Sequence, residues 1–212
     1  MSLREPAPVC PMIKAILFDM GNVLIHFDAT KSAKAFSELL GVPEKELWEV
    51  FFTSALERSY TRGEISSKEF YGKIVERFPS KKLDYATFVY LWNDIFTENS
   101  EMEELLVKLK RKYPLYLISN TNELHFEYVR KRFRLMGHFT QCFPSHGVGH
   151  RKPDPAMFEH VLREIQLKPD ETIFIDDVAE FVEAAKRFGI HGIQFTSRRA
   201  LETELRKRGV EV

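Results

Sequence analysis

Cysteine, long apolar runs and an excess of either charge are scarce in this sequence of 212 residues. Two cysteines, Cys10 and Cys142, make neither a disulfide framework nor a metal-binding spacing. No apolar stretch approaches the ~20 residues of a membrane-spanning helix, and the N-terminus lacks the apolar core of a secretory signal. Lys and Arg together number 31, as do Asp and Glu, so the basic excess typical of nucleic-acid binders is missing. We therefore expect a cytoplasmic protein with no membrane or nucleic-acid partner.

Phenylalanine is abundant instead, with 18 residues, so the chain has the material for a sizeable core. Its length exceeds one typical domain without requiring two. Residues 1–11 carry three prolines and little apolar content, and we interpret them as a disordered leader.

The stretch 13–25, IKAILFDMGNVLI, organises the rest of the chain. The apolar run Ala15–Phe18 is typical of a buried parallel strand, and it delivers one carboxylate, Asp19. Gly21 follows, where a sharp turn or close approach to a ligand is expected. Ligands of open α/β sheets bind at the carboxyl ends of the strands, so Asp19 is expected at the reactive edge.

Residues 27–97 show helical spacing of apolar side chains with no strand pattern between them. Ser66 and Glu69 form a candidate capping box at the start of one helix. Three aromatic residues, Trp48, Phe51 and Trp92, are expected in the core of this helical bundle.

From residue 98 the pattern alternates between helices and short apolar strands, at 115–118, 141–144, 172–175 and 192–195. Such alternation indicates a parallel sheet covered on both faces. Ser100 and Glu103 suggest a second capping box, and Asp154 with Pro155 a helix start. The predicted fold is α/β: a Rossmann-like parallel sheet core, 12–26 and 98–212, with an inserted helical-bundle cap, 27–97.

Three predicted strands end in polar residues: Asp19, then Ser119-Asn120, then Asp176-Asp177. The strand ends of a parallel sheet meet at one edge, so these residues are expected to converge. Oxygen ligands without His or Cys favour Mg²⁺ over zinc. A carboxylate such as Asp19 can attack phosphorus, Lys152 can neutralise a phosphoryl oxygen, and Ser119 with the Asn120 amide can donate hydrogen bonds.

The segments FDMGNVL, LISNTN, RKPDP and FIDD together resemble the four motifs of the haloacid dehalogenase-like hydrolase superfamily, in order and spacing. The FDxGNV form of the first motif is similar to a subgroup that includes sugar-phosphate phosphatases. The resemblance implies a helical cap, a small phosphorylated metabolite as substrate and Mg²⁺ as cofactor. It implies catalytic roles for Asp19, Ser119 and Lys152, and a metal site made by Asp19, Asp177 and the Gly21 carbonyl, with Asp176 beside it.

Two positions depart from the superfamily pattern. Most of its phosphatases have an Asp acting as general acid where this chain has Gly21, and often an Asp or Asn where it has Phe181. Loss of a general acid lowers the reaction rate most for esters whose leaving group is strongly basic. We therefore expect sugar 1-phosphates to react better than the matching 6-phosphates, and aryl phosphates to react readily.

Several alternatives stay open from the sequence. His26 or Asp28 could replace the missing acid, or be a linker residue and a helix start. The turn 62–64 could be a plain polar turn, or could overhang the site so that Arg62 binds substrate. The runner-up activity is 2-haloacid dehalogenation, which needs no metal, and a metabolite-binding module without turnover is a further alternative. The sequence does not indicate an oligomeric state.

Overall fold

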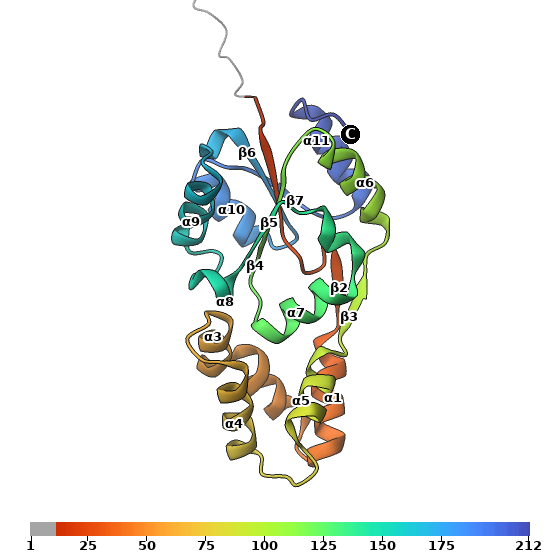
Figure 1. Ribbon diagram of the computed structural model, residues 1–212, viewed down its shortest axis with the longest axis vertical. Helices are drawn as coiled ribbons and strands as arrows, with labels where there is room; N and C mark the ends of the chain where they lie inside the picture. The colour runs from red at the N-terminus through yellow and green to blue at the C-terminus, as the bar shows by residue number, and fades with distance from the viewer. Residues whose placement is uncertain (1–11) are drawn as a thin grey trace, which may run out of the picture.

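The computed structural model describes residues 12–212, so the predicted leader 1–11 lies outside the described part. Its centre is a five-stranded sheet in the order β5-β4-β1-β6-β7, in which every neighbouring pair is parallel (Figure 1). The strands are β1 (Ala15–Phe18), β4 (Leu115–Ser119), β5 (Gln141–Pro144), β6 (Thr172–Asp176) and β7 (His191–Gln194). The expected Rossmann-like parallel sheet is confirmed.

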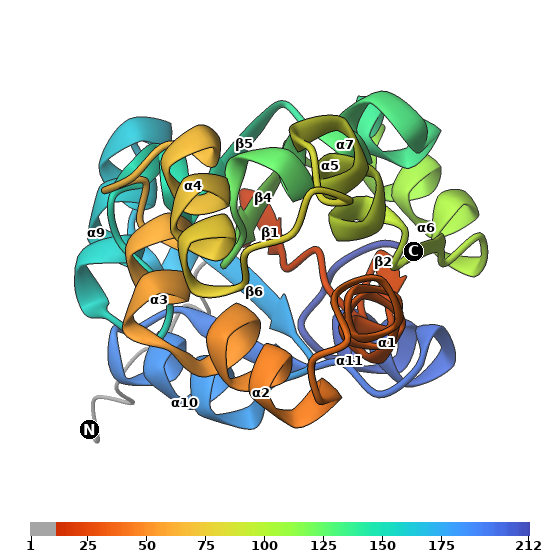
Figure 2. The same cartoon turned by 90° about the horizontal axis from the view of Figure 1, so that it is seen from below.

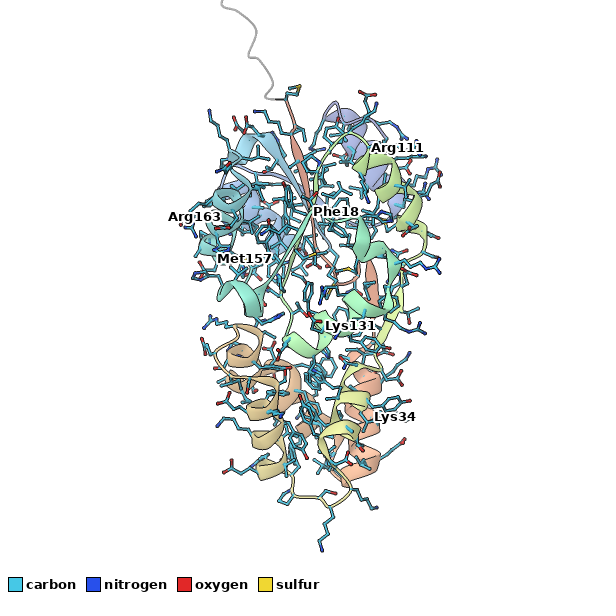
Figure 3. All side chains as sticks on the ribbon, viewed as in Figure 1. Phe18, Lys34, Arg111, Lys131, Met157 and Arg163 are labelled. Atoms are coloured by element: carbon cyan, nitrogen blue, oxygen red, sulfur yellow. The ribbon has the colours of Figure 1, made fainter. Side chains whose placement is uncertain are left out.

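Helices cover both faces of this sheet, and alternate residues of β1 point to opposite faces. Ile16 and Phe18 join one apolar cluster, whereas Leu17 joins the other. The first cluster includes residues of α6 (Glu101–Lys110), α7 (Glu123–Arg132) and α11 (Arg198–Lys207). The second cluster includes residues of α9 (Pro155–Ile165) and α10 (Ala179–Arg187). Figure 3 shows Phe18 and Met157 inside these layers, whereas Arg111, Lys131 and Arg163 project outward. Short helical turns η2 (Arg134–His138), α8 (Ser145–Val148) and η3 (Pro169–Glu171) complete the core.

A helical bundle lies below the sheet in Figure 1 and faces the viewer in Figure 2. It has its own aromatic core, centred on Phe36, Phe70 and Phe88. Its elements are α1 (Ala29–Leu40), α2 (Glu44–Trp48), the π-helical η1 (Glu49–Thr53), α3 (Ala55–Thr61), α4 (Ser67–Arg77) and α5 (Tyr85–Asn93). Two short antiparallel strands, β2 (Ile25–Phe27) and β3 (Phe96–Glu98), form the connection, so strand structure flanks the bundle. The domain limits at 27 and 97 remain our interpretation.

Helix starts follow the sequence signals where the backbone permits. Ser66 and Glu69 form the expected capping box, and the Asp154 side chain accepts a hydrogen bond from the Ala156 amide. The second capping box is wrong. Ser100 has a helical backbone conformation and makes no side-chain capping bond, whereas a capping side chain needs an extended residue to reach back to the helix.

The aromatic residues of the cap divide into two kinds. Phe51 and Trp92 are buried as expected, but Trp48 is 38% exposed and packs on Phe52, with ring centroids 4.9 Å apart. Trp48 is therefore a surface residue and the prediction for it was wrong. Among residues 12–212, no helix combines the length and apolar character needed to span a membrane.

Candidate active site

The carboxyl ends of β1, β4 and β6 face the cap across a cavity of about 250 Å³. Asp19, Ser119, Asn120, Lys152 and Asp177 all line it, together with cap residues. The structure thus brings together residues 158 positions apart, as the parallel topology predicts. Each follows or ends a buried strand, or lies in the loop before α9, so rigid elements position the polar side of the cavity.

Lys152 is the central charge of this site. Its Nζ lies 2.5 Å from Asp19 Oδ1 and 2.5 Å from Asp176 Oδ2, and its side chain is 1% exposed. Phe174 and Phe181 place ring centroids 5.3 and 5.2 Å from the same nitrogen. The aromatic ring of Phe181 therefore packs against Lys152, and this residue offers no oxygen to a metal.

Asn120 holds the loop that carries Lys152. Its Nδ2 donates to the Lys152 carbonyl at 2.8 Å, and its Oδ1 accepts from the Lys152 amide at 2.8 Å. The side chain of Asn120 thus positions the lysine, and only its main-chain amide remains for the predicted hydrogen bond to a substrate. Ser119 is 2% exposed, ends β4 and lines the cavity.

Burial perturbs the charges in this cluster. The pKa of Asp19 rises to about 6, chiefly because burial disfavours the carboxylate; Lys152 opposes this rise and Asp176 adds to it. Burial lowers the pKa of Lys152, but the two facing carboxylates outweigh it and the net shift is upward. Two carboxylates and one ammonium leave a net negative site suited to a further cation.

Oxygens of Asp19, Asp176 and Asp177 lie within 4.8 Å of one another and could hold a metal ion. Asp176 is fully buried; its Oδ2 accepts from Lys152 and its Oδ1 from the Val178 amide at 2.8 Å. Asp177 is half-buried, and its Oδ2 accepts only a 3.2 Å bond from Asn22 among the described side chains. The donors fit a hard divalent cation, and Asp177 is freer than Asp176 to ligate it.

We expect Asp177→Ala to weaken Mg²⁺ binding severely and Asp176→Ala to weaken it less. Loss of an oxygen ligand costs a hard cation more than loss of a residue that orients the ligands. Calorimetric titration with Mg²⁺ measures both, with the exposed Asp94→Ala as the matched control. The reverse order of affinities would mean that the two aspartates have exchanged roles.

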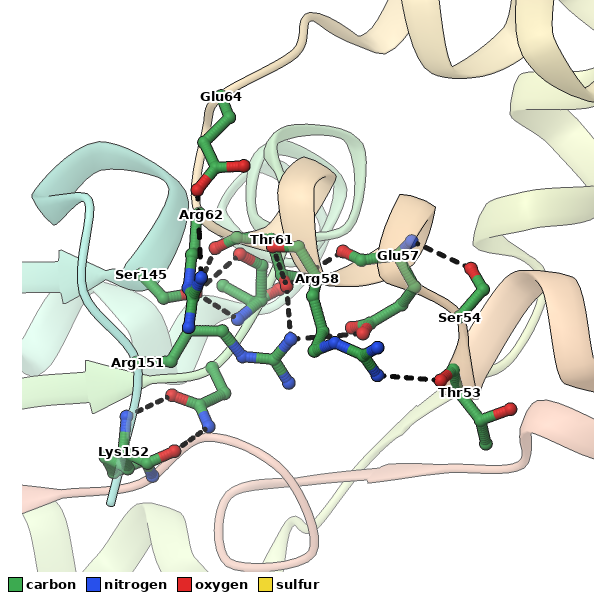
Figure 4. Close-up of polar contacts among 12 residues, drawn as sticks. Thr53, Ser54, Glu57, Arg58, Thr61, Arg62, Glu64, Ser145, Arg151 and Lys152 are labelled. Atoms are coloured by element: carbon green, nitrogen blue, oxygen red, sulfur yellow. Dashed lines mark hydrogen bonds and ion pairs between the residues drawn. The ribbon is translucent and has the colours of Figure 1, made fainter. Parts of the chain in front are cut away.

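Arg62 is not brought to the cavity. It is exposed, and its guanidinium nitrogen lies 3.8 Å from Glu64 Oε1 (Figure 4). Gly63, at a φ of 71°, approaches the main chain of α8 so closely that a Cβ there would lie 2.0 Å from the His146 carbonyl oxygen. The turn therefore docks on the core instead of overhanging the site, and the geometry gives no support to substrate binding by Arg62.

The two candidates for the missing acid also lie elsewhere. Asp28 caps α1, accepting from the Thr30 amide at 3.0 Å, and His26 pairs with Thr97 in the β2–β3 ribbon. Neither lines the cavity. At Gly21, a Cβ would lie 3.0 Å from the ring of Phe27. An aromatic ring thus packs beside the position where an acidic side chain would begin.

The sequence did not predict one polar contact between cap and core. Arg151 donates to Glu57 Oε2 at 3.0 Å and to Thr61 Oγ1 at 2.7 Å, and Ser145 donates to the Thr61 carbonyl at 2.6 Å (Figure 4). Glu57 and Thr61 also line the cavity. The available signal was the position of Arg151, directly before Lys152 in RKPDP.

His125 is a buried neutral imidazole in the cavity wall. Its Nε2 lies 2.9 Å from the Trp92 carbonyl and its Nδ1 3.0 Å from Asn122 Nδ2. Asn122 also caps α7, accepting from the His125 amide at 3.0 Å. Burial lowers the pKa of His125 from 6.5 to about 4. The ring is thus a packed wall element with both nitrogens occupied.

We expect His125 to make the protein acid-sensitive between pH 6.5 and 4. The unfolded chain protonates this histidine below about pH 6.5 and the folded chain only near 4, so the free energy of unfolding falls as pH drops through that window. At about 1.4 kcal/mol per pH unit, the loss reaches roughly 3 kcal/mol. Urea unfolding from pH 7 to 4 should show a shallower loss for His125→Gln. The exposed His26→Gln should keep the wild-type slope; an unchanged slope in His125→Gln would contradict the assignment.

A family model of haloacid dehalogenase-like hydrolases matches residues 13–189, from the start of the sheet to the end of α10. The chain belongs to this family. It is therefore a hydrolase with the motif set seen in the sequence. Among solved structures, it is similar to a haloacid dehalogenase family enzyme from Bacteroides thetaiotaomicron in complex with magnesium and inorganic phosphate. That likeness has a TM-score of 0.80 and 27% identity, and covers 88% of this chain and 96% of the other.

Among characterised relatives of this hydrolase, a sesquiterpene phosphatase from Aspergillus oryzae is 29% identical over 201 residues, covering 94% of this chain and 98% of the relative. A D-ribitol-5-phosphate phosphatase from Bacteroides thetaiotaomicron is 25% identical over 190 residues, covering 86% of this chain and 92% of the relative. A drimenol cyclase from Aspergillus calidoustus is 27% identical over 199 residues, 92% of this chain, but the chain spans only 36% of that relative's length.

Proposed function

We propose that this hydrolase is a Mg²⁺-dependent phosphatase of a small phosphorylated metabolite, with Asp19 as nucleophile. The observation that carries the proposal is the buried contact of Lys152 with both Asp19 and Asp176, beside the half-buried Asp177. This contact places the positive charge of Lys152 against the carboxylate of Asp19, at the end of β1. Relatives named as phosphatases and a similar structure holding magnesium and phosphate support the same activity.

The proposed reaction has two steps. A carboxylate oxygen of Asp19 attacks phosphorus, and the bond from phosphorus to the ester oxygen breaks, with its electron pair leaving on that oxygen, which takes a proton from water. Water then attacks the aspartyl phosphate, so that inorganic phosphate leaves and the carboxylate returns. Lys152 and Ser119 stabilise the negative charge of the phosphoryl oxygens. Mg²⁺, held by Asp19 and Asp177, would supply further charge neutralisation.

The dehalogenase alternative uses the same nucleophile but gives the acidic cluster no role. A Mg²⁺ titration with phenyl phosphate as substrate separates the candidates. We expect phosphate release that rises with Mg²⁺ and is abolished by EDTA, with no halide release from 2-chloropropionate. Metal-independent halide release, or no turnover of any phosphate ester, would overturn the phosphatase proposal.

The names of the relatives leave the substrate open, since one is a sesquiterpene phosphatase and another a D-ribitol-5-phosphate phosphatase. The expected preference for hexose 1-phosphate over hexose 6-phosphate follows from Gly21 and stays a prediction. A comparison of kcat/KM for the two esters tests it, because they differ mainly in how readily the ester oxygen leaves. A preference for the 6-phosphate would show that another residue acts as the acid.

A further inference from the structure

We propose that the ester hydrolysed here carries a hydrophobic alcohol or phenol, an extended apolar body and not a polyol. The inference rests on the proposed function, and it names the substrate class of the same site. It follows from how polar and apolar groups are divided around the cavity. The polar groups that remain available for substrate lie at the carboxyl ends of the strands, where Asp19, Ser119 and Lys152 meet.

The opposite wall of the cavity is apolar and largely aromatic. It is built from three separate segments: the β2–β3 ribbon, the π-helical η1 and the end of α5. Phe52 and Trp92 stack with ring planes 2° apart and centroids separated by 5.8 Å. The rings of Phe27, Phe52 and Phe96 are exposed or partly exposed, so they can bind an apolar body by burying area from water, and the buried Trp92 supports Phe52. The members of this wall are Phe27, Phe51, Phe52, Trp92, Ile95 and Phe96.

Most polar groups of the residues that line the cavity beside this wall already have hydrogen-bond partners in the protein. Asn122 and His125 hydrogen-bond to each other and to Trp92. Glu57 and Thr61 accept from Arg151. A sugar or polyol placed against the wall would lose its hydrogen bonds to water and find few replacements, which disfavours binding. An apolar body loses nothing by the same transfer.

Exposed apolar residues extend the wall to the mouth of the cavity. Five large apolar residues are exposed among residues 12–212: Met12, Phe27, Trp48, Tyr90 and Val178. Phe27 and Val178, at 45% and 38% exposed, line the cavity, and Trp48 packs on the lining residue Phe52. Two of the five thus line this one cavity and a third packs on a lining residue, which is typical of a surface that a hydrophobic ligand covers. The apolar body is therefore long enough to reach the mouth.

A series of 4-alkylphenyl phosphates tests the proposal. From 4-ethyl to 4-hexyl, the acidity of the leaving phenol is nearly constant, so chain length changes only the buried apolar area. We expect kcat/KM to rise about two- to fourfold per methylene until the chain leaves the cavity. The ester with a 4-hydroxymethyl group should react more slowly than its 4-ethyl counterpart, which has a methyl group in place of the hydroxyl.

Two variants link the effect to the wall. Phe52→Gln, and the isosteric Val178→Thr as a second variant that preserves shape, should each lower the gain per methylene. Tyr90→Gln is the matched control, since Tyr90 is 67% exposed and does not line the cavity; it should keep the wild-type dependence.

A flat dependence on chain length, or faster turnover of hexose or pentitol phosphates than of the hexylphenyl ester, would overturn the proposed substrate class while the phosphatase stands. No phosphate release from any ester would overturn both. An equal gain per methylene in the wild type and in both wall variants would assign the chain-length effect to another surface and contradict the inference.

Discussion

Asp19→Asn should reduce phosphate release to background, a loss of roughly 10⁴-fold or more in kcat. The amide keeps the shape of the carboxylate but is not nucleophilic, so no aspartyl phosphate forms. Asp19 is 7% exposed and contacts Lys152, which keeps Asp176 as a partner in the variant. The fold and its Tm should therefore change little. Phosphate release under saturating Mg²⁺, together with acid trapping of labelled phosphoenzyme, measures the effect.

Asp94→Asn is the control for this experiment, because Asp94 is exposed at the end of α5 and does not line the cavity. It should retain wild-type turnover. Wild-type phosphate release by Asp19→Asn would mean that another nucleophile, or water acting directly, carries the reaction.

Lys152→Met should lower kcat by about 10²–10³-fold, the usual effect of removing a preorganised charge contact worth about 2.7–4 kcal/mol. The ammonium lies between two carboxylates, and Lys152 is the only lysine or arginine that lines the cavity within residues 12–212. Steady-state kinetics with phenyl phosphate measures the loss. A change under tenfold would place Lys152 away from the chemistry.

The same variant should be less stable in the absence of metal. Removing one partner of a buried ion pair leaves an uncompensated charge, which costs about 3–5 kcal/mol. Because Mg²⁺ can neutralise the remaining carboxylates, adding it should restore more Tm in Lys152→Met than in the wild type. Lys186→Met, at an exposed lysine paired with Glu183, should show neither effect.

The sheet and the polar half of the site could be predicted from sequence because both depend on local patterns. The apolar strands are contiguous, and a parallel arrangement brings Asp19, Ser119 and Asp177 to one edge whatever the order of the strands. The different surroundings of Asp176 and Asp177 also follow from their positions, since Asp176 ends β6 with its side chain buried and Asp177 begins the loop.

The cap side of the site could not be predicted in the same way. Its wall combines Phe27, Phe52 and Trp92 from three segments, and helical spacing alone does not distinguish a core aromatic residue from one that lines a cavity. The prediction that Arg62 binds substrate found no support for a related reason. The close approach of Gly63 to His146 is a tertiary contact, and no local sequence pattern indicates it. Ser100 likewise adopts a helical backbone conformation that its residue type does not predict.

Arg151 and Lys152 are consecutive residues whose side chains contact different parts of the molecule. Arg151 holds Glu57 and Thr61 of the cap, and Lys152 holds Asp19 at the end of β1. Asn120 holds the same short peptide, because its side chain bonds both the amide and the carbonyl of Lys152. The cap contact of Arg151 and the position of the Lys152 charge are consequently joined through a single peptide bond.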